Sequence, residues 1–179
     1  MAIARADNPI IDLGEHFVKQ SARNRFYIGN AQGRQLITLN VKGTAKRKVA
    51  IGSCEIADDF QSKLIIRSLD TAYGKSPFYE HYRDEFHELF YPQGNKLIDY
   101  TLPMFKWLQE ELELDGISIS QEYNESFSKD FRNHIADISE EVPYSQTFED
   151  RNGFVEGLSM IDVLFHLGPE TEAWFKSQV

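Results

Sequence analysis

The sequence predicts an α+β protein: an N-terminal β-hairpin or small sheet packed against a helical segment, in one compact domain over residues 1–179. Strand-like patterns come first and are followed by helices, a second strand-like stretch and further helices, an order that favours α+β over a regular βαβ alternation. A chain of 179 residues is long enough to form one core, and its 41% hydrophobic and 13% aromatic residues are too many for a disordered protein.

The N-terminal part supplies the predicted strands. PIIDL at 9–13 indicates a short strand, and two β-rich runs at 23–29 and 35–41 flank a loop at 30–34. Gly33 in that loop tolerates a positive φ, so the two runs are expected to form a hairpin.

Three helices are expected next. The first is predicted over 59–73, with Asp58 or Asp59 as its cap and Gly74 as its terminator. The second opens with Ser76 as cap and Pro77 at its first position. The third runs from about Asn95 to Leu114, and Pro103 is expected to kink or divide it.

The C-terminal part alternates between strand and helix signals. ISISQEY at 117–123 indicates a strand, the polar stretch 124–141 gives no assignment, and 144–148 suggests a second short strand. Ser159 to Asp162 form a capping-box pattern before an apolar helix that Gly168 closes, and Pro169 starts a last short helix.

Several classes of protein are disfavoured by composition. No run of eighteen apolar residues and no apolar leader is present, so we expect no membrane span and a cytoplasmic location. The single Cys54 excludes an internal disulfide, and its VAIGSCEIA context indicates a buried small hydrophobic residue rather than a nucleophile. The sequence leaves the oligomeric state open.

Charge is distributed unevenly along the chain. Residues 1–50 carry nine Lys/Arg and three Asp/Glu, a balance of +6, whereas residues 51–179 carry ten and twenty-five, a balance of −15. The N-terminal part is therefore suited to a phosphate or carboxylate ligand, unless its cations pair with acidic residues elsewhere in the fold. The acidic remainder and the lack of a recognised module disfavour nucleic acid as a partner.

The familiar catalytic motifs are absent from the sequence. It contains no GxxxxGK[ST], GxGxxG, HExxH, CxxC or GxSxG pattern, which disfavours P-loop, dinucleotide, zincin and α/β-hydrolase chemistry. The five histidines are scattered without i,i+3 or i,i+4 spacing, so we expect no metal site and no cofactor.

The stretch KQSARNR at 19–25 is the strongest candidate site. On a strand, Arg23 and Arg25 would project to one face about 7 Å apart and bracket a phosphate or diphosphate, while Asn24 would anchor a neighbouring loop from the opposite face. Lys19 and Gln20 would close over the same anion.

Two alternatives remain open for these cations. Arg23 and Arg25 would instead form ion pairs with acidic residues on adjacent helices if the segment is structural. The basic loop from Lys42 to Lys48 either supplements the anion site or is simply solvated.

A second polar constellation follows at 129–134. Asp130, Arg132 and His134 would share one face of an extended chain, and Asp130 would then orient His134 as a general base. The alternative is an Asp130–Arg132 ion pair in a surface loop. His166, on an apolar helix, is expected to be a satisfied core residue, and Asp162 to cap backbone amides.

A set of segments resembles the WbqC-like protein family in order and spacing. They are EHFVKQSARNRFYI, LITLNVKG, AYGKSPFYEHYRDEF, NKLIDYTL, DFR, YSQTF and GFVEGLSMIDVLFHLGPE. Members occur in gene clusters for surface polysaccharide and O-antigen synthesis, so the resemblance implies a context rather than a reaction. None of these segments is a catalytic signature in itself.

The resemblance also carries implications for particular residues. Positions that match the family's polar motifs and helix junction are Lys19, Gln20, Ser21, Arg23, Asn24, Arg25, Tyr73, Ser76, Pro77, Asp130 and Arg132. The family usually has Asn where His166 stands, which argues against His166 as an essential base. Family members usually begin with a further strand and helix, so we expect this chain to be truncated or a short variant, with PIIDL lacking a neighbour.

Two functional hypotheses follow. The first is a transferase or sugar-modifying enzyme that acts on a nucleotide-linked amino sugar, with Lys19, Arg23 and Arg25 holding the diphosphate. The alternative is a non-catalytic accessory protein that binds an anionic ligand or an acidic partner surface.

Overall fold

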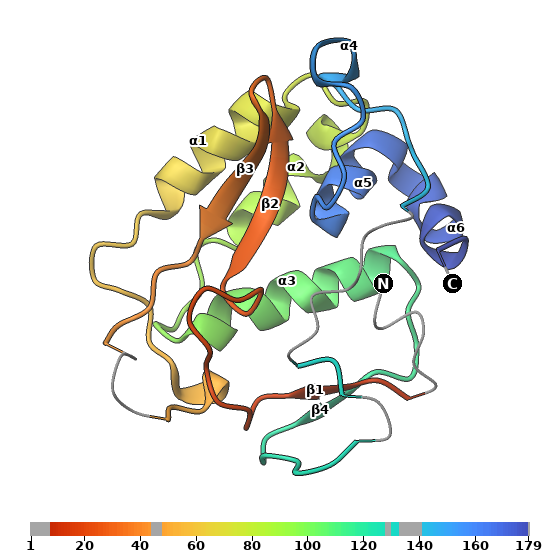
Figure 1. Cartoon of the computed structure of the whole chain (residues 1–179). Helices are drawn as coiled ribbons and strands as arrows, with labels where there is room; N and C mark the ends of the chain where they lie inside the picture. The colour runs from red at the N-terminus through yellow and green to blue at the C-terminus, as the bar shows by residue number, and fades with distance from the viewer. Residues whose placement is uncertain (1–7, 44–47, 128–129, 133–140, 179) are drawn as a thin grey trace.

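The computed structural model describes residues 8–43, 48–127, 130–132 and 141–178. In chain order its elements are β1 (Ile10–Asp12), β2 (Arg25–Asn30), β3 (Gly33–Thr38), η3 (Ile51–Ser53), α1 (Ser62–Tyr73), α2 (Tyr79–Glu88), α3 (Leu97–Glu111), β4 (Ser118–Ser120), α4 (Glu149–Asn152), α5 (Met160–Leu167), η4 (Gly168–Glu170) and α6 (Thr171–Lys176). The predicted α+β class is confirmed (Figure 1).

The N-terminal hairpin forms as predicted, with a shorter turn. β2 and β3 pair antiparallel from Arg25 opposite Thr38 to Asn30 opposite Gly33, so two residues rather than five connect them. Gly33 has a φ of 98°, a conformation that favours glycine. Phe26 and Ile28 turn toward the core, and α1 lies against β2 (Figure 1).

A second small sheet joins distant parts of the chain. β1 pairs in parallel with β4, with Ile10 opposite Ser118 and Asp12 opposite Ser120. The expectation that PIIDL lacks a neighbour is therefore wrong, because the predicted strand at 117–123 supplies one. Parallel partners far apart in sequence leave no local signal of their pairing.

The starts of the first two helices differ from the prediction. α1 begins at Ser62, while Asp58 lies in the preceding turn and forms an ion pair with Lys42 at 2.5 Å. α2 begins at Tyr79, because the Ser76 side chain turns inward instead of capping the helix. Gly74 ends α1 with a φ of −58°, so the terminator is not left-handed.

The later elements follow the predicted order with two corrections. α3 continues through Pro103 as a single helix. No strand forms over 144–148. α5 begins directly after Ser159 and is closed by Gly168, as predicted, and the positive φ of 54° at that residue favours glycine.

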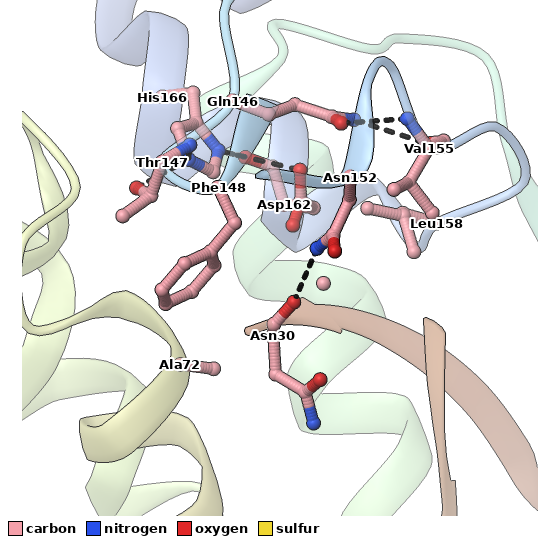
Figure 2. A pocket seen from close by; sticks show the side chains of 11 residues that line it. Asn30, Ala72, Gln146, Thr147, Phe148, Asn152, Val155, Leu158, Asp162 and His166 are labelled. Atoms are coloured by element: carbon pink, nitrogen blue, oxygen red, sulfur yellow. Dashed lines mark hydrogen bonds and ion pairs between the residues drawn. The ribbon is translucent and has the colours of Figure 1, made fainter. Parts of the chain in front are cut away.

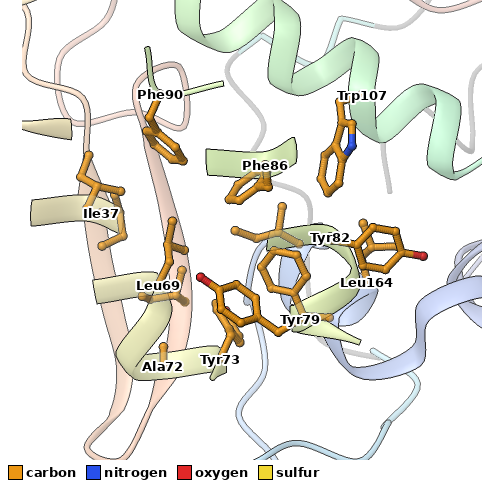
Figure 3. Close-up of a cluster of buried hydrophobic side chains, with 14 residues drawn as sticks. Ile37, Leu69, Ala72, Tyr73, Tyr79, Tyr82, Phe86, Phe90, Trp107 and Leu164 are labelled. Carbon is orange, nitrogen blue, oxygen red and sulfur yellow. The ribbon is translucent and has the colours of Figure 1, made fainter. Parts of the chain in front are cut away.

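An aromatic core holds the helices together, as Figure 3 shows. Phe165 of α5 packs edge-to-face on Tyr73 of α1 and on Phe86 of α2, with ring centroids 5.0 and 5.5 Å apart. Phe86 also contacts Trp107 of α3 at 5.1 Å. These contacts fix α5 against α1 and α2, and thereby position the polar residues described below.

Cys54 lies in a second hydrophobic cluster and is 1% exposed, which confirms its predicted packing role. Burial raises the pKa of its thiol. In the part of the chain that the structure describes, no helix has both the length and the apolar character needed to cross a membrane.

Candidate functional site

The predicted anion-binding segment is mostly a turn. Lys19 and Gln20 are exposed, and Gln20 has a φ of 59°. Only Arg25 of the segment belongs to β2, and Arg23 precedes the strand. The prediction that Arg23 and Arg25 alternate along one strand face is therefore wrong, because the chain is still turning at Arg23.

Arg23 is neutralised inside the chain. Its Nε and Nη2 donate to the two Glu15 carboxylate oxygens at 3.0 and 2.5 Å, and the two side chains are 10% and 14% exposed. Arg23 therefore forms an ion pair, as the alternative prediction stated. Its partner Glu15, however, follows β1 and does not lie on a helix. Nη2 also donates to the carbonyl oxygen of Arg132 at 2.8 Å.

Asp130 and Arg132 form an ion pair next to Arg23. The Arg132 Nη2 donates to Asp130 Oδ2 at 2.5 Å, and Nη1 lies 3.3 Å from the buried Asp12 carboxylate. The hydrogen bonds that Asp130 accepts, and then its charge, raise the pKa of the Arg132 guanidinium. The structure therefore brings 23–25 and 130–132 together, whereas His134 lies outside the described residues.

The two remaining residues of the segment have different environments. Asn24 is 6% exposed and its Nδ2 donates to the Leu39 carbonyl oxygen at 2.8 Å, so it anchors the chain after β3 as its predicted inward position implies. Arg25 is half-buried, and its Nε is buried without a hydrogen-bond partner. Among the described residues, Arg25 has no ion pair or hydrogen bond from its guanidinium.

Tyr73 and Ser76 lie in a different polar cluster, close to Thr147, Asp162 and His166. Ser76 Oγ is 2.8 Å from Thr147 Oγ1 and 3.2 Å from His166 Nε2. Thr147 Oγ1 is 2.8 Å from the same nitrogen. Two hydroxyls thus converge on one imidazole nitrogen (Figure 2 shows Thr147 beside His166).

Hydrogen bonds assign the neutral tautomer of His166. The Thr147 N–H donates to Nε2 at 2.9 Å, so Nε2 accepts and the proton resides on Nδ1. Nδ1 donates to the Asp162 carbonyl oxygen at 2.7 Å and lies 3.3 Å from Asp162 Oδ2. His166 is 9% exposed and well satisfied, which confirms the core-residue prediction.

Asp162 is a buried carboxylate, 1% exposed. Its Oδ2 accepts the Tyr144 hydroxyl at 2.7 Å, so it does not serve as the predicted helix cap. Burial raises the pKa of Tyr144 and of Tyr73, and the charge of Asp162 raises both further, so each remains a neutral phenol. Asp162 Oδ1 has no hydrogen bond of normal length, and the Tyr73 hydroxyl is a second donor close to the carboxylate.

A small cavity lies beside this cluster (Figure 2). Its volume of about 10 Å³ suits roughly one water molecule. The polar residues Asn30, Gln146, Thr147, Asn152, Asp162 and His166 are among those that line it, although most of the exposed lining is apolar. The arrangement offers a proton-accepting imidazole, a carboxylate behind it and hydroxyls in front, which are the parts required for general acid–base chemistry.

The sequence patterns did not predict that Asp162, His166, Thr147 and Tyr144 come together in one polar cluster. The i,i+4 spacing of Asp162 and His166 on one helix was the available signal, and the capping-box pattern gave it a different interpretation. Thr147 and Tyr144 join only through tertiary contacts. Within the described residues, no group of three or more His, Cys, Asp or Glu side chains is arranged to hold a metal ion.

The fold and the polar cluster together describe a small α+β protein with a buried Asp162–His166 pair beside a small cavity. A family model, the WbqC-like protein family, matches residues 1–142, so the chain belongs to this family. The match includes Tyr73, Ser76 and the 19–25 segment, whereas Thr147, Asp162 and His166 lie beyond it. No curated protein and no solved structure matched the chain.

Proposed function

We propose that this protein is a transferase or sugar-modifying enzyme that acts on a nucleotide-linked amino sugar during surface-polysaccharide synthesis in the cytoplasm. The sugar and the pathway come from the context of the family. The observation that supports catalysis is the Asp162–His166 pair, whose Nε2 faces the hydroxyls of Ser76 and Thr147 beside a cavity.

In this proposal His166 acts as the general base. A substrate amine replaces the Thr147 N–H at Nε2 and loses its proton to that nitrogen while it attacks an acyl thioester. The new C–N bond forms as the C–S bond breaks, and the proton then passes from His166 to the departing thiolate. Asp162, 3.3 Å from Nδ1, stabilises the imidazolium ion between these two events.

The 19–25 segment holds the diphosphate in this proposal, with Arg25 as its central contact. Among the described residues the Arg25 guanidinium has no ion pair, and Lys19 and Gln20, earlier in the same segment, are exposed. Arg25 and Gly29 occupy the same face of β2, about 13 Å apart at the usual rise per strand residue. Gly29 lines the cavity, so an extended ligand reaches both places.

The accessory-protein function is the second candidate, and one observation favours it. Both ring nitrogens of His166 already have partners inside the chain, as they would in a purely structural histidine. The family preference for Asn at this position also fits a structural hydrogen-bonding role.

The substitution His166→Asn separates the two functions, because it follows the family's usual residue. Thermal-shift measurements with a panel of UDP- and dTDP-linked amino sugars identify the ligand, and turnover is then assayed with acetyl-coenzyme A. We expect the variant to fold and to retain the ligand-induced shift, with turnover reduced at least about 100-fold. Unchanged turnover would exclude His166 as the base, and binding without turnover in the parent protein would favour the accessory function.

A second variant tests the diphosphate contact. Arg25→Ala is expected to weaken nucleotide-sugar binding by about tenfold or more, since a charge-assisted contact is lost. Arg67→Ala, on the exposed side of α1, is the matched control and should leave affinity unchanged. Equal affinities for both variants would remove the 19–25 segment from the site.

A further inference from the structure

One face of the β2–β3 hairpin points away from the core, because α1 packs against the other face (Figure 1). Tyr27 stands opposite Leu36 and Arg34 stands opposite Gly29, so these residues share this outer hairpin face. Arg25 belongs to the same face, since it precedes Tyr27 by two strand residues. Under the proposed function, the outer hairpin face is the surface between the diphosphate at Arg25 and the cavity that Gly29 lines.

The outer hairpin face combines an exposed apolar surface with a positioned cation. Tyr27 and Leu36 are 36% and 39% exposed, although both side chains are large and mainly apolar. The guanidinium carbon of Arg34 lies 4.2 Å from the centroid of the Tyr27 ring. This cation–π contact confirms that the two side chains share a face, and it holds the guanidinium over the ring.

The N–H groups of Arg34 are free to bind an anion. A guanidinium carries five N–H donors in its own plane, and stacking on a ring occupies only its flat face. Among the described residues, no carboxylate pairs with Arg34 and no acceptor takes a hydrogen bond from its side chain. No Asp or Glu occurs in the sequence between Glu15 and Glu55, so the hairpin supplies no partner. Arg23 and Arg132, in contrast, are paired with carboxylates.

The spacing along the hairpin matches a sugar that follows the diphosphate. Tyr27 lies about 7 Å beyond Arg25 along β2, and Arg34 stands across from the next residue on that face. A sugar ring attached to a diphosphate at Arg25 therefore covers Tyr27 and Leu36, which suit the apolar C–H face of the ring. A group at the far end of the sugar reaches Arg34. The planar guanidinium fork suits a carboxylate there, because a carboxylate accepts two parallel hydrogen bonds.

We infer that the outer hairpin face is the sugar subsite and that it selects a hexuronic acid, a sugar with a carboxylate at C6. The inference rests on the proposed function, because it specifies the amino sugar of the nucleotide-linked substrate as one that also carries a carboxylate. The ring lies on Tyr27 and Leu36, and the carboxylate accepts two hydrogen bonds from Arg34. A neutral sugar gains the apolar contact alone and leaves the Arg34 donors in water.

The methyl glycosides of glucuronic acid and of glucose form a matched pair of probes for this subsite. Their rings are the same, and only the glucuronide has a carboxylate. In ¹H–¹⁵N spectra of the whole protein, methyl glucuronide should produce saturable shifts at the Arg34 Nε–H and the Leu36 amide. It should bind at least about tenfold more tightly than methyl glucoside, since a charge-assisted contact is added. Equal binding of the two glycosides, or no saturable shift with the glucuronide, would overturn the inference.

Sodium acetate separates a sugar subsite from a simple anion site. Acetate has the carboxylate without the ring, so it should produce much weaker shifts than methyl glucuronide at the same two groups. Equal responses to acetate and to the glucuronide would reject the sugar and leave only an anion contact at Arg34.

Variants of Arg34 identify the group that selects the carboxylate. Arg34→Gln should remove the preference for the glucuronide, and Arg34→Lys should restore only part of it, because lysine keeps the charge without the planar fork. Arg67→Ala, on the exposed side of α1, is the control and should keep the full preference. The same spectra show whether each variant is folded. A preference that persists in Arg34→Gln would place the carboxylate elsewhere and contradict the inference.

These measurements are independent of the assay for the proposed enzyme. Turnover of a neutral amino sugar without any preference for the glucuronide would reject the uronic-acid subsite and retain the enzyme. A preference for the glucuronide that depends on Arg34, without turnover of any nucleotide sugar, would retain the subsite and reject only the enzyme.

Discussion

Two polar regions of this protein use charge in opposite ways. The cation-rich region near β1 and β4 contains Arg23 paired with Glu15, and Arg132 paired with Asp130 and Asp12. The Asp162 region, between α5 and the end of β2, contains one carboxylate and a neutral histidine behind a cavity. The first region pairs Arg23 and Arg132 with carboxylates, whereas the second surrounds its carboxylate with neutral hydrogen-bonding groups.

The two regions differ in whether their charged groups indicate a function. Two of the cations that are conspicuous in the sequence, Arg23 and Arg132, are paired in the fold with carboxylates. A carboxylate in an apolar helix is buried at an energetic cost that packing alone does not explain, and such groups are concentrated in functional sites. Arg25 differs from Arg23 and Arg132, because within the described residues it has no such partner.

The largest expected effect comes from Asp162→Ala. The substitution leaves the Tyr144 hydroxyl without its acceptor and removes the charge beside His166 Nδ1, so we expect a loss of about 3 kcal/mol in the free energy of unfolding. Urea denaturation measures it. Asp58→Ala removes an exposed ion pair and serves as the control, with a change below about 0.5 kcal/mol. Similar losses in both variants would contradict the distinction between the regions.

Arg23→Ala should have the next largest effect. It leaves Glu15, whose side chain is 14% exposed, without its partner and removes the donor to Arg132, so we expect a loss of about 2 kcal/mol. Lys19→Ala, in the exposed turn, should change stability by less than about 0.5 kcal/mol. If Arg23→Ala instead keeps full stability but loses nucleotide-sugar binding, Arg23 belongs to the ligand site and its ion pair is replaceable.

The smallest effect concerns pH and His87, which lies outside both regions. Burial lowers the pKa of His87 below the usual 6.5 despite the neighbouring Asp70, so the folded state binds fewer protons than the unfolded state. Its stabilising contribution is therefore complete above the unfolded pKa and is lost as pH falls through the folded value. Unfolding experiments between pH 7 and 5 should show this loss.

Two variants identify the source of that pH dependence. His87→Gln should reduce it, and His81→Gln, on the exposed side of the same helix, should not. The half-buried Glu141, whose pKa is raised by its partial burial, acts in the opposite direction, because the folded state then holds its proton more tightly. A slope that is unchanged in His87→Gln would assign the effect to another group.

Local rules in the sequence determined much of the architecture. The hairpin, its Gly33 turn, the course of the helices and the end of α5 at Gly168 all follow from patterns within a few residues. The buried positions of Cys54 and His166 also followed from their apolar neighbours. These features depend on backbone preference and burial, both of which operate over short stretches of chain.

Only the tertiary structure decided how the polar residues are used. Glu15 reaches Arg23, β4 reaches β1, and Thr147 reaches Ser76 and His166 across long separations in the chain. The sequence predicted Ser76 and Asp162 as helix caps, because a cap needs only a local partner. In the fold the Ser76 hydroxyl lies against Thr147 and His166, and the Asp162 carboxylate accepts the Tyr144 hydroxyl; no local pattern reveals these partners.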